Sequence, residues 1–200
     1  GEAVKDLFID AVFAYTFYQD FIGFEFAAES PLRSQQIQAY RVSANSESTV
    51  YTLTSSIGAT YYIGDYLNIG GNYTWTDLYE QQDDPIIPAY NTPKHKFNIS
   101  FGAVDIKHNL RLGDKSIPIR NWGFNFNFRW VQGFQFEGSP QFTGFVPTYY
   151  TLDAQINKRI PKWKLRFKLG ATNLLNRDYI QVYGGPEIGR LGYFQVSYGL

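Results

Sequence analysis

A run of nine residues, Trp122 to Trp130 with the sequence WGFNFNFRW, constrains the fold of this chain more than any other feature. Aromatic side chains occupy every second position, and the positions between them hold Gly, Asn, Asn and Arg. This strict alternation predicts a β-strand, because successive side chains of a strand point to opposite faces. One face of the strand is therefore strongly apolar and the other is polar.

The same alternation recurs along most of the chain. We expect eight strands, at about residues 5–18, 49–62, 66–77, 95–105, 121–133, 148–159, 162–173 and 191–200. Tight turns are expected at 63–65 and 160–161, and long links at 19–48, 78–94, 134–147 and 174–190. Long loops at one rim and tight turns at the other are typical of outer-membrane barrels. The link at 106–120 breaks this rule, because it is long where a short turn is expected.

The composition agrees with a membrane barrel. Aromatic and charged residues each make up 18% of the 200 residues, whereas about a quarter of an ordinary soluble domain is charged. A formal net charge of zero gives no reason to expect a nucleic-acid partner. The chain has no Cys, which excludes disulfides and thiolate chemistry. The mean hydropathy of −0.30 is expected when half of each strand faces water.

Alternation alone does not say which face is inside, and a lipocalin-like soluble barrel would turn its apolar face inward. Two features favour lipid outside. The polar faces are rich in amides and cations, and all four Trp lie on the apolar face near strand ends, where a membrane barrel carries its aromatic girdles. We expect Trp75 and Trp130 at one interface and Trp122 and Trp163 at the other. The predicted fold class is all-β, an antiparallel transmembrane β-barrel segment.

Three segments resemble the last strands of TonB-dependent outer-membrane receptors: TPKHKFNISF at 92–101, VPTYYTLDAQINKRIPKWKLRFKLGATNLLNRDY at 146–179, and GGPEIGRLGYFQVSYGL at 184–200. The family's Pro-x-His/Lys strand entry, its Asn-Leu-Leu-Asn…Tyr motif and its Gly-Arg before the final strand are matched in order. The matching residues are Pro93 to Lys96, Asn173 to Asn176 with Tyr179, and Gly189-Arg190.

The resemblance implies a C-terminal portion, residues 1–200, of a barrel of about 22 strands whose plug domain lies outside this chain. It implies a receptor in the outer membrane of a Gram-negative bacterium that takes up a large, scarce nutrient with energy delivered through TonB. Candidate ligands are a ferric siderophore, haem, cobalamin or an oligosaccharide. Implied partners are membrane lipid, the plug and the remaining strands, TonB through the plug, and a surface lipoprotein. A complete eight-stranded barrel with a structural or adhesive role is the alternative, and a barrel enzyme is a third.

Candidate ligand or plug contacts fall into two groups. The lumen group holds polar-face residues of two strands, Asn125, Asn127, Arg129, Lys164, Arg166 and Lys168. The outer-loop group holds aromatic residues of the long links, Tyr90, Phe134, Phe136, Phe142, Phe145 and Tyr183. A basic cluster that also includes Lys158, Arg159 and Lys162 could attract an anion, but cations inside barrels normally pair with acids on neighbouring strands or on a plug.

No residue pattern predicts an enzyme, a metal site or a bound cofactor. His95 and His108 have no Glu or Cys at metal-ligand spacing, and no nucleophile motif such as Gly-x-Ser-x-Gly is present. A two-residue turn at Ile160-Pro161 would place Asp153 opposite Lys168 on the lumen face, as an ion pair.

Overall fold

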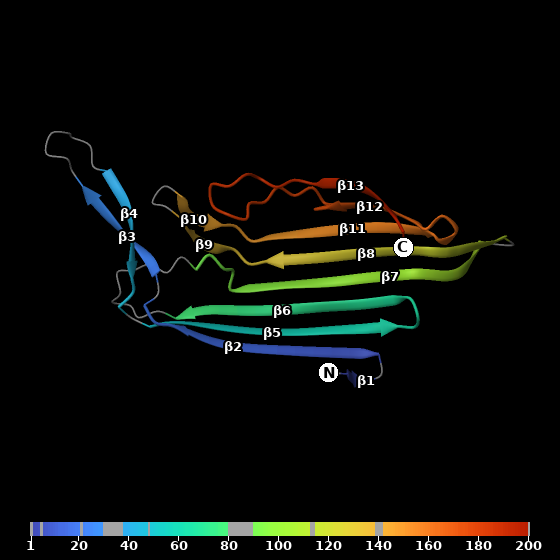
Figure 1. Cartoon of the computed structure of the whole chain (residues 1–200), viewed down its shortest axis with the longest axis horizontal. Helices are drawn as coiled ribbons and strands as arrows, with labels where there is room; N and C mark the ends of the chain where they lie inside the picture. The colour runs from blue at the N-terminus through green and yellow to red at the C-terminus, as the bar shows by residue number, and fades with distance from the viewer. Residues whose placement is uncertain are drawn as a thin grey trace.

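The computed structural model describes residues 2–4, 6–20, 22–29, 38–47, 49–79, 90–112, 115–138 and 142–199. These residues form β-strands joined by turns and loops (Figure 1), and a 3₁₀ turn covers Pro161–Trp163. No helix among them is long and apolar enough to cross a membrane.

The main element is an antiparallel sheet of nine strands in the order β1-β2-β5-β6-β7-β8-β11-β12-β13. Eight of these strands match the eight that alternation predicted. The bounds of all nine strands are β1 Glu2–Val4, β2 Leu7–Tyr18, β5 Val50–Ile63, β6 Leu67–Tyr79, β7 His95–Leu112, β8 Lys115–Val131, β11 Tyr149–Ile160, β12 Leu165–Thr172 and β13 Leu191–Tyr198. The unpredicted member is the short β1.

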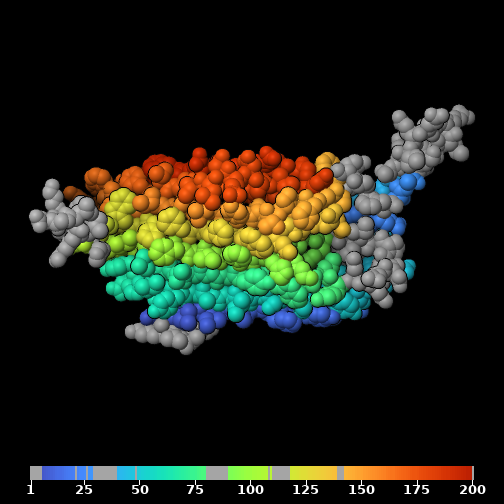
Figure 2. Space-filling view, turned by 180° about the vertical axis from the view of Figure 1, so that it is seen from behind, coloured from blue at the N-terminus to red at the C-terminus, as the bar shows by residue number. Residues whose placement is uncertain are grey.

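The sheet is open. The short β1 and the C-terminal β13 form its two edges, and no ladder joins them among the described residues. Figure 2 shows the strands as bands that run in chain order across the sheet, from blue at one edge to red at the other. The first and last long strands, β2 and β13, do not pair with each other, as expected for one portion of a larger barrel. The sequence analysis kept a closed eight-stranded barrel as an alternative. The described residues do not form one.

Strand register gives the sheet two unlike faces. On the apolar face, Phe126 lies between Phe101 and Ala154, and on the polar face Asn127 lies between Ser100 and Asp153. The pattern continues across the sheet, so apolar rows and polar rows alternate along all the long strands. Since lipid must cover the apolar face of a transmembrane barrel, the polar face lines the lumen.

The two ends of the sheet also differ. We call the end with the tight turns 64–66 and 161–164 the turn end, and the opposite end the loop end. At the loop end two hairpins leave the sheet (Figure 1): β3 Ile22–Glu29 with β4 Gln38–Asn45, and β9 Phe134–Glu137 with β10 Thr143–Val146. The sequence analysis expected long links here and did not predict either hairpin. Each hairpin has its own strand pairing outside the main sheet.

The unusual link at 106–120 is a continuation of β7 and β8 (Figure 1), whose paired strands extend to Leu112 and Lys115 at the turn end. The prediction of a long loop was wrong. Register shifts interrupt the ladder between Ala103 and Lys107, where Asp105 has a φ of 49°, and Asn121 on the partner strand has a φ of 57°. A bulge changes which face successive residues occupy, so alternation in the sequence breaks although the strand continues.

The tryptophans follow the predicted levels. Trp130 lies beside Phe97 at the loop end, and Trp75, opposite His95, lies on the same face at that end. Trp122 shares the face with Trp130 but lies eight residues nearer the turn end, which is roughly 26 Å along a strand. That span matches the height of about 25 Å expected for the apolar band. Trp163 lies in the turn itself.

Candidate functional site

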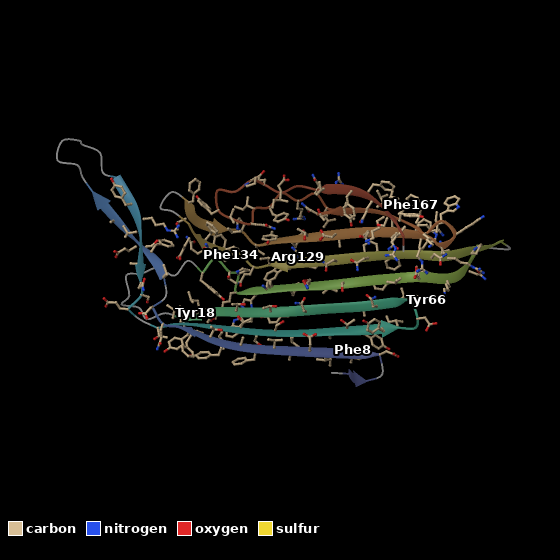
Figure 3. All side chains as sticks on the ribbon, in the orientation of Figure 1. Phe8, Tyr18, Tyr66, Arg129, Phe134 and Phe167 are labelled. Carbon is tan, nitrogen blue, oxygen red and sulfur yellow. The ribbon has the colours of Figure 1, made fainter. Side chains whose placement is uncertain are left out.

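Two cations lie near each other on the lumen face toward the loop end. Arg129 of β8 lies between Asn98 of β7 and Thr151 of β11, and Lys96 lies two residues from Asn98 on the same face. Figure 3 shows Arg129 on the part of β8 that leads to Phe134 and the loop end. Lys96, Asn98, Arg129 and Asn72 border a hollow of about 370 Å³. The amide of Asn98 donates a hydrogen bond to the side-chain oxygen of Asn72.

Both cations are uncompensated within the part of the chain that the structure describes. The ion pairs found there join Lys94 to Asp77 and Arg159 to Asp105, and neither involves Lys96 or Arg129. Two positive charges without a carboxylate, in a concave polar setting, give the hollow a positive potential. Chemically, this arrangement suits a carboxylate, phosphate or other anion.

An aromatic pair extends the hollow toward the outside. Tyr149 lines it, and its ring stacks on that of Tyr179 with centroids 4.6 Å apart. The two tyrosines also border a second hollow of about 410 Å³, with Arg177 and Asp178. Arg177 places its guanidinium carbon 4.4 Å from the ring centre of Tyr150. Aromatic faces beside cations suit planar or ring-shaped ligands with anionic groups.

The loop that carries Tyr179 is anchored by Asn173, which is only 2% exposed. Its side-chain amide donates hydrogen bonds to the carbonyls of Arg177 at 2.7 Å and Ile188 at 3.3 Å, and its side-chain oxygen accepts one from the N–H of Arg177. Asn176 accepts a further bond from the N–H of Arg190 at 3.0 Å. The asparagines of the Asn-Leu-Leu-Asn motif therefore shape the loop and bring Tyr179 onto Tyr149.

A second group of cations lies at the turn end of the lumen face. Arg159 and Arg166 are directly opposed on β11 and β12, and Lys168 is opposite Asn157. Arg159 forms an ion pair with Asp105, with a nitrogen–oxygen distance of 3.0 Å. An acid on a nearby strand thus compensates the charge of Arg159, as the sequence analysis expected for cations inside a barrel. The buried Nε atom of Arg166 has no hydrogen-bond partner among the described residues.

The residues of the predicted basic cluster do not all lie on the same face of the sheet. Lys158 lies on the apolar face, opposite Trp122 and Phe167. Its Nζ donates to the carbonyl of Arg120 at 2.6 Å and lies 5.0 Å from the ring centre of Trp122. A lysine can reach the polar boundary of the bilayer in this way.

The prediction for the β11–β12 hairpin was wrong in register and in the place of Lys164. The turn has four residues, 161–164, and Lys164 closes it with a φ of 52° and its N–H on the carbonyl of Pro161. Lys164 is therefore in the turn and not on the lumen face of a strand. Lys168 faces Asn157, while Asp153 accepts a bond from the N–H of Asn173 at 2.9 Å. The shift is an even number of residues, so the assigned faces are preserved.

Asn125 and Asn127 lie on the polar face of β8. Asn125 is between Gly102 and Gln155, and Asn127 between Ser100 and Asp153. They connect the loop-end cations to the turn-end cations along one polar row, which makes them lumen-lining residues.

Most of the predicted loop aromatics lie on the β9–β10 hairpin or beside it. Phe134, Phe136 and Phe145 lie on the β9–β10 hairpin, and a Cβ at Gly144 would meet the ring of Tyr183 at 2.3 Å. Phe142 and Phe145 remain 54% and 58% exposed. Tyr90 lies in the loop before β7, where burial raises the pKa of its phenol above the usual range.

The structure describes the side chain of one of the two histidines. His95 lies on the apolar face, where its Nδ1 is 2.5 Å from the hydroxyl of Tyr73. The side chain of His108 lies outside the described residues. Within the described part of the chain, no group of three or more His, Cys, Asp or Glu is placed to hold a metal ion.

Sequence reasoning missed Lys96, Tyr149 and Tyr179 as site residues. The signal for Lys96 was present, since it alternates with Phe97 and belongs to the polar face of its strand. The stack of Tyr149 on Tyr179 had no local signal, because it depends on how the 173–190 loop folds back.

An open antiparallel sheet with an apolar outer face and a polar lumen face has the fold of a wall segment of a transmembrane β-barrel. Two solved TonB-dependent transporters share this fold. The "Copper transporter OprC" matches with a TM-score of 0.68 and 15% identity, over 97% of this chain and 29% of that chain. The FrpB iron transporter from Neisseria meningitidis matches with a TM-score of 0.64 and 15% identity, over 98% of this chain and 29% of that chain.

This chain therefore spans less than a third of either structure, and at this identity the likeness establishes the fold alone. No known protein-family model and no curated protein matches the sequence.

Proposed function

We propose that this chain is part of the barrel wall of an outer-membrane receptor that imports a large, scarce nutrient with energy delivered through TonB. The observation that carries the proposal is the open sheet, whose apolar face suits lipid and whose polar face carries an uncompensated cationic hollow. In this proposal the plug and the remaining strands complete the barrel, and the protein is not an enzyme. The structural neighbours, a copper and an iron transporter, support a transport role.

Among the candidate ligands, the hollow favours those that carry negative charge. Lys96 and Arg129 can each donate charge-assisted hydrogen bonds, and Tyr149 with Tyr179 offers an aromatic face beside them. A ferric chelate or haem presents carboxylates or similar anionic groups, whereas a neutral oligosaccharide would leave two cations without partners. A desolvated cation without a partner costs free energy, so a neutral ligand is disfavoured.

Uptake by intact cells tests the proposal. Cells that carry the full-length receptor as their only route would be given ferric citrate, haemin, cyanocobalamin or maltohexaose, with and without TonB. We expect TonB-dependent uptake of one of the anionic compounds, and a roughly tenfold loss of apparent affinity in Arg129→Gln or Lys96→Gln, the equivalent of one charge-assisted hydrogen bond. Lys107→Gln, an exposed cation near the turn end, serves as the control. Absence of TonB-dependent uptake for all four compounds would contradict the proposal.

A further inference from the structure

The apolar face contains a hollow of about 700 Å³ over β8, β11, β12 and β13. Its floor is a row of small residues in register: Ala154, Ala171 and Gly192 lie side by side on three adjacent strands. Phe126 of β8 continues the same row and forms one wall. The face that must contact acyl chains is therefore indented at this place.

A row of larger side chains bounds the hollow toward the turn end. In the next row, Ile156 and Leu169 are directly opposed and project beyond the small residues, with exposures of 46% and 59%. From this row to Arg190 the hollow covers about four residues of strand, roughly 13 Å. That length suits one saturated chain lying along the strands in the leaflet nearest the loops.

A cation lines the hollow on its loop-end side. Arg190 lines the hollow immediately before β13, its N–H bonded to Asn176 and its guanidinium 3.5 Å from the carbonyl of Leu174. The asparagine-anchored loop thus fixes the backbone at this residue. No carboxylate within the described part of the chain forms an ion pair with Arg190. An apolar channel with an uncompensated guanidinium at its mouth matches an amphiphile whose headgroup is anionic.

We propose that this hollow is a lipid site, in which an acyl chain of a phosphate-bearing lipid of the loop-side leaflet lies over Ala154, Ala171 and Gly192, with its phosphate on Arg190. The site is on the outside of the wall and is independent of the ligand hollow in the lumen. Its occupancy does not require that the receptor transports any particular nutrient. The Gly-Arg motif before the last strand then has two roles, since the arginine binds the headgroup and its backbone closes the loop.

Gly192 offers a direct way to fill the hollow. A Cβ at this position would have only the carbonyl oxygen of Gly170 within reach, at 4.0 Å, so a side chain fits without disturbing the backbone. Gly192→Leu would occupy the space of the acyl chain. Ala59→Leu is the matched control, because Ala59 lies on the same apolar face between Ile9 and Gly71, far from the hollow.

The test is native mass spectrometry of the full-length receptor in detergent, titrated with dimyristoyl phosphatidic acid or with dimyristoylglycerol, which lacks the phosphate. We expect one phosphatidic acid to be retained by the unaltered protein and by Ala59→Leu, and at least fivefold less by Gly192→Leu. Arg190→Gln should weaken phosphatidic acid roughly tenfold, by the loss of a charge-assisted hydrogen bond, without changing the weaker binding of dimyristoylglycerol.

Equal retention by Gly192→Leu and Ala59→Leu would overturn the acyl-chain site. Equal loss of both lipids in Arg190→Gln, or no loss of either, would overturn the assignment of the headgroup. If Gly192→Leu does not assemble into a barrel, Arg190→Gln with the two lipids decides the question alone.

Discussion

The carboxylate of Asp153 accepts a hydrogen bond from the backbone N–H of Asn173 at 2.9 Å, so a lumen-face residue of β11 holds the residue that directly follows β12. Asn173 has a φ of 49° and is buried, and its amide makes three further hydrogen bonds within the 173–190 loop. This one residue joins the barrel wall to the loop that presents Tyr179 at the lumen mouth.

Asn173→Ala should therefore loosen the loop as well as lower stability. The substitution removes the buried amide and leaves two carbonyls and one N–H without partners, at a cost of about 1–3 kcal/mol in the free energy of unfolding. Asn173→Gly keeps the positive φ without strain and should recover part of this loss. Urea unfolding of the full-length receptor in vesicles measures the stability, and limited proteolysis reports the loop. Wild-type protease resistance in Asn173→Ala would contradict the anchoring role.

The ion pair between Asp105 and Arg159 should matter more for charge balance than for net stability. Both side chains are about one-third exposed, so the pair is expected to contribute about 0.2–1 kcal/mol. Asp105→Asn keeps a residue type that tolerates positive φ and removes only the charge, leaving Arg159 opposed to Arg166. We expect a small loss of stability that added salt diminishes, because salt screens the repulsion between the guanidiniums.

Asp65→Asn in the exposed β5–β6 turn is the control for this change. A loss of stability that is unaffected by salt would show that Asp105 acts through its hydrogen bonds or backbone and not through its charge.

The four-residue turn fixes the β11–β12 register, and cysteine pairs can test it because this chain has no Cys. Asn157 and Lys168 are directly opposed on the lumen face, with Cβ atoms expected about 4.5–5.5 Å apart. The double variant Asn157→Cys with Lys168→Cys should crosslink on mild oxidation. Asp153→Cys with Lys168→Cys should not, since these residues are offset by four positions, roughly 13 Å. Mass spectrometry of peptides from the oxidised protein distinguishes the two outcomes.

The long strands could be predicted from the sequence because each has one face in lipid and one in water. Alternation from Trp122 to Trp130 defines β8 and its two faces without any knowledge of partners. The signal fails where the backbone departs from regular pleating. At Asp105 a bulge shifts the pattern, and β7 and β8 continue beyond it without a readable period.

Turn and loop geometry was less predictable for a different reason. Lys164 adopts a positive φ, which lysine does not favour, so nothing at this position indicates a four-residue turn. The predicted faces of β11 and β12 are still correct, because the observed register differs from the predicted one by an even number of residues. The ligand hollow depends on Asn98, Arg129 and Tyr149 from three strands, and the contact with Tyr179 depends on a folded loop, so its full composition requires the structure.

The assignment of faces predicts that a lysine lowers the stability much more at one of two adjacent positions of β6 than at the other. Ile69 lies on the apolar face in one row with Phe101, which is itself opposite Phe126, midway between Trp122 and Trp130. Ile69→Lys should therefore cost about 2–4 kcal/mol in the free energy of unfolding, the range for a lysine near the bilayer midplane.

Asn68→Lys is the matched control, because Asn68 lies on the polar, lumen-facing side of β6 opposite Gly102. Its cost should stay below about 1 kcal/mol, as is usual for a substitution on a solvated surface. Lys158 shows the natural exception, since it occupies the apolar face but lies at the level of Trp122, where its Nζ reaches the carbonyl of Arg120. Urea titration of the two variants folded into phosphatidylcholine vesicles measures both costs. If Asn68→Lys were the more damaging change, the apolar face would be the inner one, and the wall described here would be inverted.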